Sequence, residues 1–479
     1  MSNRSYESEF EQILVKYQRA REWLLSLITD PTGSRYHQEK SRELRFREFR
    51  EQIDRTQRFL NFVGNPEAQF NSVHVAGTSG KGSVVNMIAA ILTAAGLKIG
   101  FHISPYLQVC NEKLIVNGKM ISPSEFVTLV EDFRNLYVDW TRSGNVHGSL
   151  KYGEAWVALT YYWLAKQRVD WGVIETGLGG RYDPTNVLPS KMAVITNVDY
   201  DHVVTLGPDL TDIATHKVGI IKPHGLVVTS EQTPEILFII EKETDENQSR
   251  LYRLGKDFDF RVEVQDSDGS IITVQAPHHK FEGVRIAMRG DFQPVNAALA
   301  IASVDVLAAE YNIPITQGVV MEGLEGVQYP GRMEVVQRNP IVILDGAHNK
   351  HKMQGLVDSI KTIYEDKKIV GIIGMLSTKD SPGMVEILSP ITHRWIITQP
   401  HVFGKPSTPP DEIAGHIRKV HPSAGVQQYD DVLEALDTAI SEADQDDLLV
   451  VTGSLYLVGE ARERWFPSQE ILLSLERGS

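Results

Sequence analysis

The sequence has almost no cysteine, no long hydrophobic run and no excess of basic residues. Its single cysteine among 479 residues, Cys110, excludes an internal disulfide and a cysteine-based zinc site, and it favours a reduced, cytoplasmic setting. No uncharged apolar run reaches the roughly 18 residues that a membrane-spanning helix needs. The polar start of the chain also lacks the apolar segment of a secretory signal. A net charge of −14 gives no overall attraction to nucleic acid or to anionic membranes, so neither is an expected partner.

The composition is that of a globular protein with more than one domain. Hydrophobic residues make up 42% of the chain and charged residues 23%, which is enough to form a sizeable core. At ~150 residues per domain the length predicts two or three domains. Residues 1–70 are charge-dense and predict helices. An apolar stripe of Phe46, Phe49, Ile53 and Leu60 indicates a solvated amphipathic helix lying on a domain.

From Ser72 onward, short apolar runs alternate with helix-length segments. This alternation is typical of a largely parallel sheet with helices on both faces. Residues 256–285 mix charged and β-branched residues with Gly/Asp turns and predict an antiparallel excursion. The predicted strands are Ser72–Ala76, Trp171–Thr176, Met192–Thr196 and Leu226–Thr229, and the predicted helices include Val84–Ala95 and Ala155–Lys166.

A second α/β series follows the turn Tyr329-Pro330-Gly331, which is a candidate hinge because Pro and Gly end regular structure. The expected fold is therefore α/β, with a P-loop-type domain followed by a smaller Rossmann-like domain. The predicted strands of the second series are Ile341–Leu344, Ile369–Gly374, Trp395–Thr398 and Leu448–Thr452.

The strongest local signal is a glycine-rich loop between a predicted strand and a predicted helix. Its glycines let backbone N–H groups turn toward a polyphosphate, and the helix N-terminus adds partial positive charge. Lys81 can neutralise the β- and γ-phosphates, and the Ser83 hydroxyl can bind Mg²⁺. The loop differs from the common nucleotide-binding motif by one extra glycine between Lys81 and Ser83. The loop comprises Gly77, Thr78, Ser79, Gly80, Lys81, Gly82 and Ser83.

Three further residues follow strands or a helix of the first series. Glu175 ends a buried strand at the edge where ligands of open α/β sheets bind, and it is either a metal ligand or a cap or ion-pair residue. His202 is either a metal ligand or a structural histidine. Lys217, judged by spacing alone, is a helix-surface lysine.

Two residues near the hinge suit nucleotide recognition. Arg332 offers a planar guanidinium for phosphate, with a hinge salt bridge as the alternative. Asp345, at the end of a strand, can accept ribose hydroxyls, with a helix N-cap as the alternative.

Together these motifs resemble the folylpolyglutamate synthase/dihydrofolate synthase family, a branch of the Mur-type ATP-dependent amide ligases. The resemblance extends from about Arg55 to Glu460. It includes the phosphate loop with its extra glycine, Ser104-Pro105-Tyr106-Leu107, the run from Glu175 to Asn186, Pro330-Gly331-Arg332, Asp345-Gly346-Ala347-His348-Asn349, and Thr452-Gly453-Ser454-Leu455-Tyr456.

The resemblance implies a role for individual residues. Residues 77–83 hold the ATP phosphates, and Asn296, Arg332, Asp345 and His348 complete the nucleotide site. Lys217 falls where the family carries a carbamylated lysine, and it joins Lys81 and His202 as catalytic. The implied ions are magnesium, with two ions expected, and potassium; the implied magnesium ligands are Ser83, Ser104, Glu175 and His202.

The resemblance also implies domain boundaries: a helical N-terminal extension over 1–70, an ATP-binding Mur ligase central domain over 71–328, and a Rossmann-like ligase domain over 329–479.

The departures from the family lie mainly in the acid-substrate pocket. Gly153 stands where the family has a phenylalanine that helps hold a pterin, Lys151 adds a cation, and Pro184 replaces an alanine. The predicted pocket residues are Lys151, Gly153, Glu154, Asp183 and Pro184. Outside the pocket, Ser79 replaces an asparagine.

The expected activity is ATP-dependent ligation of L-glutamate to a folate-type carboxylate through an acyl phosphate, by a monomeric enzyme with small-molecule substrates only. The alternatives are a Mur-type ligase for a non-folate acid, a P-loop ATPase or kinase, and a non-catalytic nucleotide-binding protein.

Overall fold

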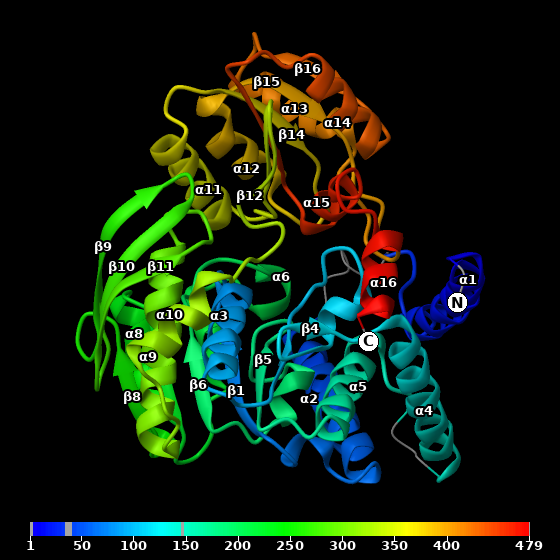
Figure 1. Cartoon of the computed structure of the whole chain (residues 1–479), viewed down its shortest axis with the longest axis vertical. Helices are drawn as coiled ribbons and strands as arrows, with labels where there is room; N and C mark the ends of the chain where they lie inside the picture. The colour runs from blue at the N-terminus through cyan, green and yellow to red at the C-terminus, as the bar shows by residue number, and fades with distance from the viewer. Residues whose placement is uncertain (1–2, 34–40, 145–147, 479) are drawn as a thin grey trace.

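The computed structural model describes residues 3–33, 41–144 and 148–478, and both predicted α/β series are present as domains, one above the other in Figure 1. Residues 1, 2 and 34–40 of the predicted N-terminal extension lie outside the described part. In the part of the chain that is described, no helix combines the length and the apolar character needed to cross a membrane.

An eight-stranded sheet forms the centre of the first domain. Its strands are parallel neighbours except at one edge, where β3 and β4 form antiparallel pairs. The four strands predicted in this domain are all present, with ends that differ by at most one residue. The order across the sheet is β4 (Lys119–Met120), β3 (Ile115–Val116), β2 (Ile99–His102), β5 (Trp171–Glu175), β1 (Asn71–Ala76), β6 (Met192–Ile195), β7 (Leu226–Thr229) and β8 (Arg250–Arg253).

Helices cover both faces of this sheet because successive strand residues point to opposite sides. Val194 packs in the core shared with α3 and α9, whereas the next residue, Ile195, packs with α7 and α8 on the other face. Ile174 belongs to a third core cluster with α2, α4 and α5. The helices are α2 (Arg42–Phe62), α3 (Lys81–Ala94), α4 (Pro123–Arg142), α5 (Tyr152–Lys166), α6 (Val203–Leu206), α7 (Leu210–Val218), α8 (Pro234–Glu246), α9 (Gln293–Tyr311) and α10 (Gln317–Glu325).

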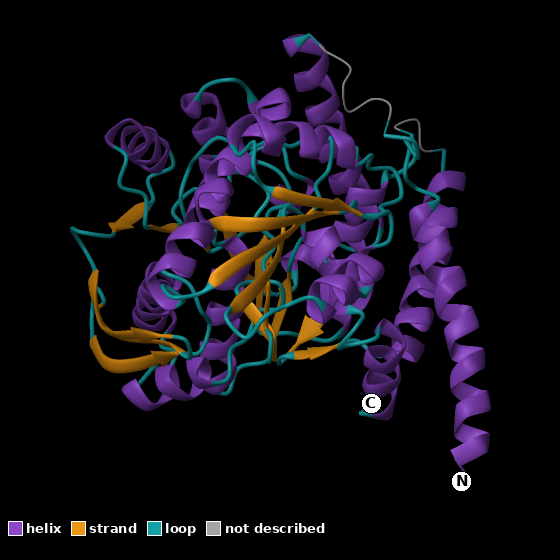
Figure 2. Ribbon diagram, turned by 90° about the horizontal axis from the view of Figure 1, so that it is seen from above, coloured by secondary structure: helices purple, strands orange, loops and turns teal. Residues whose placement is uncertain are grey.

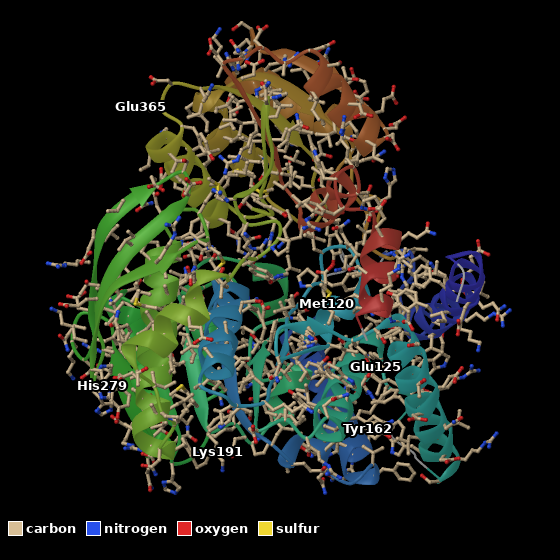
Figure 3. The ribbon with its side chains drawn as sticks, viewed as in Figure 1. Met120, Glu125, Tyr162, Lys191, His279 and Glu365 are labelled. Carbon is tan, nitrogen blue, oxygen red and sulfur yellow. The ribbon has the colours of Figure 1, made fainter. Side chains whose placement is uncertain are left out.

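The predicted antiparallel excursion is a three-stranded sheet of β9 (Asp259–Asp266), β10 (Gly269–Gln275) and β11 (Lys280–Ile286). The turn between β10 and β11 is tied to α9 by His279, whose Nδ1 lies 2.6 Å from an oxygen of the buried Asp305 (Figure 3).

The second domain has a six-stranded sheet in which only the edge strand β12 is antiparallel. All four strands predicted here are present. One face packs against α11, α12 and α13, and the other against α14 and α15. The strands are β12 (Glu334–Arg338), β13 (Ile341–Leu344), β17 (Asp447–Thr452), β14 (Lys368–Ile373), β15 (Thr392–Ile397) and β16 (Gly425–Gln428), and the helices are α11 (Lys350–Ile363), α12 (Ser381–Leu388), α13 (Pro410–Val420), α14 (Val432–Ser441) and α15 (Leu455–Arg462).

The first and last helices of the chain pack beside each other on the first domain. Helix α1 (Asn3–Leu25) packs along α4 and stands at the edge of the molecule in Figure 2. The C-terminal helix α16 (Ser468–Arg477) leaves the second domain and returns to the same place, where Leu472 joins a core cluster with Tyr17 of α1. The last helix is thus part of the first domain's packing, although its sequence follows the second domain.

The predicted amphipathic stripe of α2 lies against the first domain. Leu60 is fully buried, and the Phe46 and Phe49 rings contact the rings of Tyr182 and His216. This helix therefore covers the end of α7, next to Lys217.

Candidate active site

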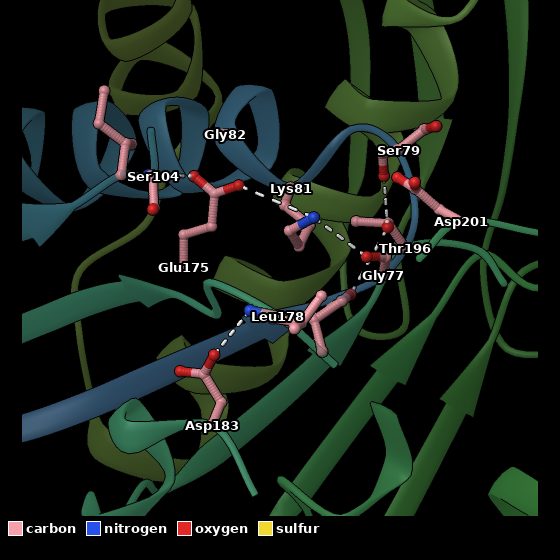
Figure 4. Close-up of polar contacts among 12 residues, drawn as sticks. Gly77, Ser79, Lys81, Gly82, Ser104, Glu175, Leu178, Asp183, Thr196 and Asp201 are labelled. Carbon is pink, nitrogen blue, oxygen red and sulfur yellow. Dashed lines mark hydrogen bonds and ion pairs between the residues drawn. The ribbon is translucent and has the colours of Figure 1, made fainter. Parts of the chain in front are cut away.

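The phosphate loop connects β1 to α3, as the sequence predicts. Gly77 and Gly80 have φ values of 152° and 79°, which glycine adopts without strain. A side chain at Gly80 would overlap Asn296 of α9, and one at Gly77 would overlap Thr196. Thr196 Oγ1 donates a 2.6 Å hydrogen bond to Ser79 O, so the loop is held in shape by the strand beside it (Figure 4).

Lys81 and Glu175 face each other at the carboxyl end of the sheet. Lys81 Nζ lies 3.9 Å from Glu175 Oε1 and donates a 3.1 Å hydrogen bond to Gly77 O, and Ser104 N donates to Glu175 Oε2 at 3.1 Å (Figure 4). Burial raises the pKa of Glu175, and the charge of Lys81 opposes that rise. A buried carboxylate in this position is stabilised by any further cation.

His202 lies at the junction of the two domains, directly before α6. Its neighbour Asp201 accepts hydrogen bonds from Lys379 Nζ at 3.0 Å and Asn349 Nδ2 at 3.1 Å, both from the second domain. Partial burial and the nearby cations, Lys379 foremost, lower the pKa of His202 to about 3. The imidazole is therefore neutral, the form in which histidine binds metal ions.

Of the four predicted magnesium ligands, only Glu175 and His202 have side chains of the kinds that most often bind metal ions in proteins. Among the described residues, no group of three or more His, Cys, Asp or Glu side chains is placed to hold an ion. Magnesium that accompanies a nucleotide needs few such ligands, because phosphate oxygens and water fill its other positions. Two serine hydroxyls, the buried carboxylate of Glu175 and the neutral His202 fit that kind of site.

Lys217 is buried in the last turn of α7, so the surface position expected from spacing alone is wrong. The spacing of residues along one helix carries no information about the Gly179-Gly180 turn, which covers the end of α7. The turn packs so closely that a side chain at Gly180 would overlap Lys217 O. Burial, and secondarily the charge of Lys81, lower the pKa of Lys217 well below that of a free lysine. A neutral amine in this position can react with CO₂.

The hinge holds two of the predicted nucleotide residues. The Arg332 guanidinium stacks on the Tyr329 ring at 5.1 Å, and Tyr329 in turn lies against Gly82 of the phosphate loop. Asp345 accepts hydrogen bonds of 2.9 Å from Met333 N and Ala347 N. Arg332 is thus aimed at the loop, whereas both oxygens of Asp345 already bind the hinge backbone.

The predicted acid-pocket carboxylates are engaged inside the protein. Glu154 binds the Arg55 guanidinium through both oxygens, at 2.6 and 2.9 Å, with both side chains buried. Asp183 accepts from Leu178 N and from the Thr185 amide and hydroxyl. Both carboxylates therefore hold neighbouring protein groups in place.

The other three predicted pocket residues are more open. Lys151 and Gly153 are exposed at the start of α5, and Pro184 is half-buried. A Cβ at Gly153 would meet nothing within 4 Å.

Beside Gly153 lies an aromatic and cationic cluster, of which sequence reasoning offers only Tyr152, as the alternative source of an aromatic face. The Tyr152 and Trp156 rings are 6.3 Å apart, and Lys113 Nζ lies 5.6 Å from the Trp156 ring. Lys405, from the second domain, lies 4.6 Å from the Tyr456 ring. Tyr106 and Tyr456 occur in the quoted motifs and could have been found, but no sequence signal singles out Lys113 or Lys405.

Three more residues of the second domain reach the nucleotide site without having been predicted. His351 Nδ1 lies 3.2 Å from Ser79 Oγ of the phosphate loop, Lys379 pairs with Asp201, and Lys352 Nζ lies 3.0 Å from His348 Nε2. The only available signal is that two of them directly follow the motif that ends at Asn349.

Comparison with known proteins assigns both domains. The Mur ligase middle domain family matches residues 141–304, and the Mur ligase, glutamate ligase domain family matches residues 331–455. The folylpolyglutamate synthase of Lacticaseibacillus casei is 30% identical over 84% of this chain and 92% of its own length. The dihydrofolate synthase/folylpolyglutamate synthase of Bacillus subtilis is 31% identical over 86% of this chain and 94% of its own length.

Solved structures agree with this assignment. The Mycobacterium tuberculosis folylpolyglutamate synthase complexed with ADP is similar with a TM-score of 0.85 and 25% identity, over 95% of this chain and 99% of the other. A folylpolyglutamate synthase complexed with AMPPCP and folate is similar with a TM-score of 0.79 and 27% identity, over 94% of this chain and 99% of the other. The α/β chain with its glycine-rich phosphate loop therefore belongs to the folylpolyglutamate synthase/dihydrofolate synthase family of the Mur ligase superfamily.

Proposed function

We propose that this protein is an ATP-dependent ligase that joins L-glutamate to a folate-type acid, as a tetrahydrofolylpolyglutamate synthase, a dihydrofolate synthase or both. The observation that carries the proposal is the set of cations that converge on the phosphate loop from both domains. Lys81 comes from the loop itself, and Arg332, Lys352 and Lys379 come from the hinge and the second domain. A polyanion such as ATP is the ligand that balances this charge.

The reaction proceeds by two transfers. The acid's carboxylate attacks the γ-phosphorus of ATP, which releases ADP and forms an acyl phosphate. The amine of glutamate then attacks the acyl carbon and displaces phosphate, which leaves an amide and a proton. The protein contributes alignment and neutralisation of the developing charge.

Individual residues divide this work. Lys81 binds the phosphates, and Arg332, held over Tyr329, approaches them from the hinge. Asn296, at the back of Gly80, positions the base side of the nucleotide, and His348 lies on the second-domain side. Contacts between the domains exclude water from the acyl phosphate.

Ser83, Ser104, Glu175 and His202 would hold magnesium, which supplies further neutralisation of phosphate charge when bound. Burial of Lys217 supports its role as the carbamylated lysine, because a carbamate forms only on a neutral amine. The second magnesium ion, potassium, the monomeric state and the cytoplasmic location remain parts of this proposal.

The proposed division of the chain gives an ATP-binding central domain in 71–328, a ligase domain in 329–479 and a supporting helical extension in 1–70. The acid lies between the first two, where Tyr152 and Trp156 provide apolar faces and Lys113 and Lys405 provide charge for carboxylates. A non-folate acid is the second candidate, because Gly153 offers no ring and Lys151 adds an exposed cation.

Phosphate release tests the proposal directly. Purified protein is given ATP and magnesium with a panel of pteroates and folates, each with and without glutamate. We expect release only when both acid and glutamate are present, together with a product heavier by one glutamyl residue. Phosphate release without glutamate would indicate an ATPase, and ADP formation without phosphate release would indicate a kinase. Glutamate-dependent release with non-folate acids alone would indicate the second candidate.

A further inference from the structure

Lys352 is a cation in the first turn of α11 with no carboxylate of its own. Among the described residues its polar contact is His348, whose Nε2 lies 3.0 Å from Lys352 Nζ. His348 Nδ1 lies 2.7 Å from the carbonyl oxygen of Gly346, which can only accept, so Nδ1 carries the proton. The Nε2 of the neutral ring is then an acceptor, and it fixes the direction of the Lys352 ammonium.

The surroundings of Lys352 carry an excess of positive charge. The charge that most favours the ammonium is that of Asp201, which already accepts hydrogen bonds from Lys379 and Asn349. Burial is the main cause that lowers the pKa of Lys352 to about 7, and Lys81 and Arg332 lower it further. Holding an uncompensated ammonium here costs free energy in the absence of ligand.

Lys352 is also close to the reacting end of the nucleotide site. It directly follows His351, whose Nδ1 lies 3.2 Å from Ser79 Oγ of the phosphate loop. Helix α11 directs its N-terminus toward the same region, since its N-cap, Asn349, binds Asp201. The partial positive charge of that terminus favours an anion.

We propose that Lys352 binds the phosphoryl group that is transferred from ATP to the acid. This inference rests on the proposed function and adds to it a residue from the second domain. As the bond between the γ-phosphorus and the β,γ-bridging oxygen breaks and the bond to the acid's carboxylate oxygen forms, the ammonium donates hydrogen bonds to the non-bridging oxygens. No proton changes place, and the ammonium emerges with its charge unchanged.

This role makes phosphoryl transfer depend on the contact between the domains. Lys81 comes from the first domain and Lys352 from the second, so both reach the phosphate only while the domains are together. Beside the phosphate loop, His351 contacts Ser79, and Asp201 contacts its second-domain partners, and these contacts help to hold that arrangement. An open arrangement would bind ATP without activating it.

The test compares Lys352→Met with Lys350→Met. Lys350 lies on the same helix turn, is 59% exposed and pairs with Asp380 at 2.9 Å, so its replacement removes the same charge outside the site. Calorimetry measures the affinity for ADP and for AMPPCP with magnesium, and turnover is measured in parallel. We expect Lys352→Met to weaken AMPPCP by about ten- to a hundredfold, to change ADP much less and to lower kcat. Lys350→Met should match the wild type, and Lys352→Arg should be intermediate.

A thermal melt without nucleotide checks that the variant folds. Because a repelling charge is removed, Lys352→Met should melt no lower than the wild type, and added AMPPCP should stabilise it less. If Lys352→Met loses affinity for ADP and AMPPCP equally, so that the preference for AMPPCP is unchanged, the proposal is wrong. If the wild type fails to ligate glutamate but the selective loss of AMPPCP binding is found, the proposed function fails and the phosphate contact of Lys352 stands.

Discussion

The buried ion pair between Arg55 and Glu154 should be essential to the stability of the first domain. Arg55→Met would leave the Glu154 carboxylate, 2% exposed, without the guanidinium that binds both its oxygens. Removing one partner of such a buried pair costs ~3–5 kcal/mol, because the remaining charge is desolvated and uncompensated. The double variant Arg55→Met/Glu154→Met, in which no charge is stranded, should recover most of this loss.

Lys166 provides a matched control on the same helix as Glu154. Its pair with Asp132, at 2.7 Å, has side chains that are 49% and 42% exposed, so Lys166→Met should cost ~0–1 kcal/mol. Urea unfolding followed by tryptophan fluorescence compares the variants, with Trp156 of α5 close to the pair. A cost for Arg55→Met no larger than that for Lys166→Met would refute the assignment of Glu154 to the scaffold. If the double variant is stable but binds the acid substrate more weakly, Glu154 contacts the acid as first predicted.

The remaining predictions concern the reaction and the acid. Lys81→Ala should lower turnover by about a hundredfold or more, because the ammonium that lies beside the Gly77 carbonyl and Glu175 also binds the phosphates; near-normal turnover would contradict the phosphate-loop assignment. Since protonation blocks carbamylation of Lys217, activity should fall in mildly acidic, CO₂-depleted buffer and return with bicarbonate. Short carboxylic acids should partly rescue the activity of Lys217→Ala. If intact-mass measurement of the active enzyme shows an unmodified amine, the carbamate is excluded. Gly153→Phe should lower the KM for folate-type acids by up to about tenfold, given ~0.5–1.5 kcal/mol for an aromatic contact; an ordinary micromolar KM in the wild type would mean that Tyr152 already supplies the ring.

The fold and the phosphate loop are predictable because their causes are local. Strands such as Met192–Ile195 are continuous apolar runs bounded by polar residues, and the loop's glycines mark backbone that only glycine adopts easily. The return of α16 to the first domain has no such signal. Its amphipathic sequence would suit a surface of either domain, and only tertiary packing on α1 and α4 decides between them.

The site is only partly predictable for a related reason. Lys217 is buried and Lys352 is half-buried, although both occur in helical segments whose spacing is that of surface residues. Sequence periodicity describes one helix, whereas burial here comes from a partner distant in the chain. Glu154 shows the opposite case: a carboxylate beside a predicted pocket proves to be an internal partner of Arg55.

The two halves of the site therefore select their ligands in different ways. Around the phosphate loop, Lys352 lies among other cations that include Lys81 and Arg332, so a polyphosphate is attracted by charge that the protein leaves unbalanced. In the acid region the carboxylates Glu154 and Asp183 are already satisfied by protein donors, which leaves ring faces and the lysines beside them to contact a substrate. Acid preference should accordingly respond to changes at Gly153 and Tyr152 that leave nucleotide affinity unaltered, because the two sets of contacts share no side chain.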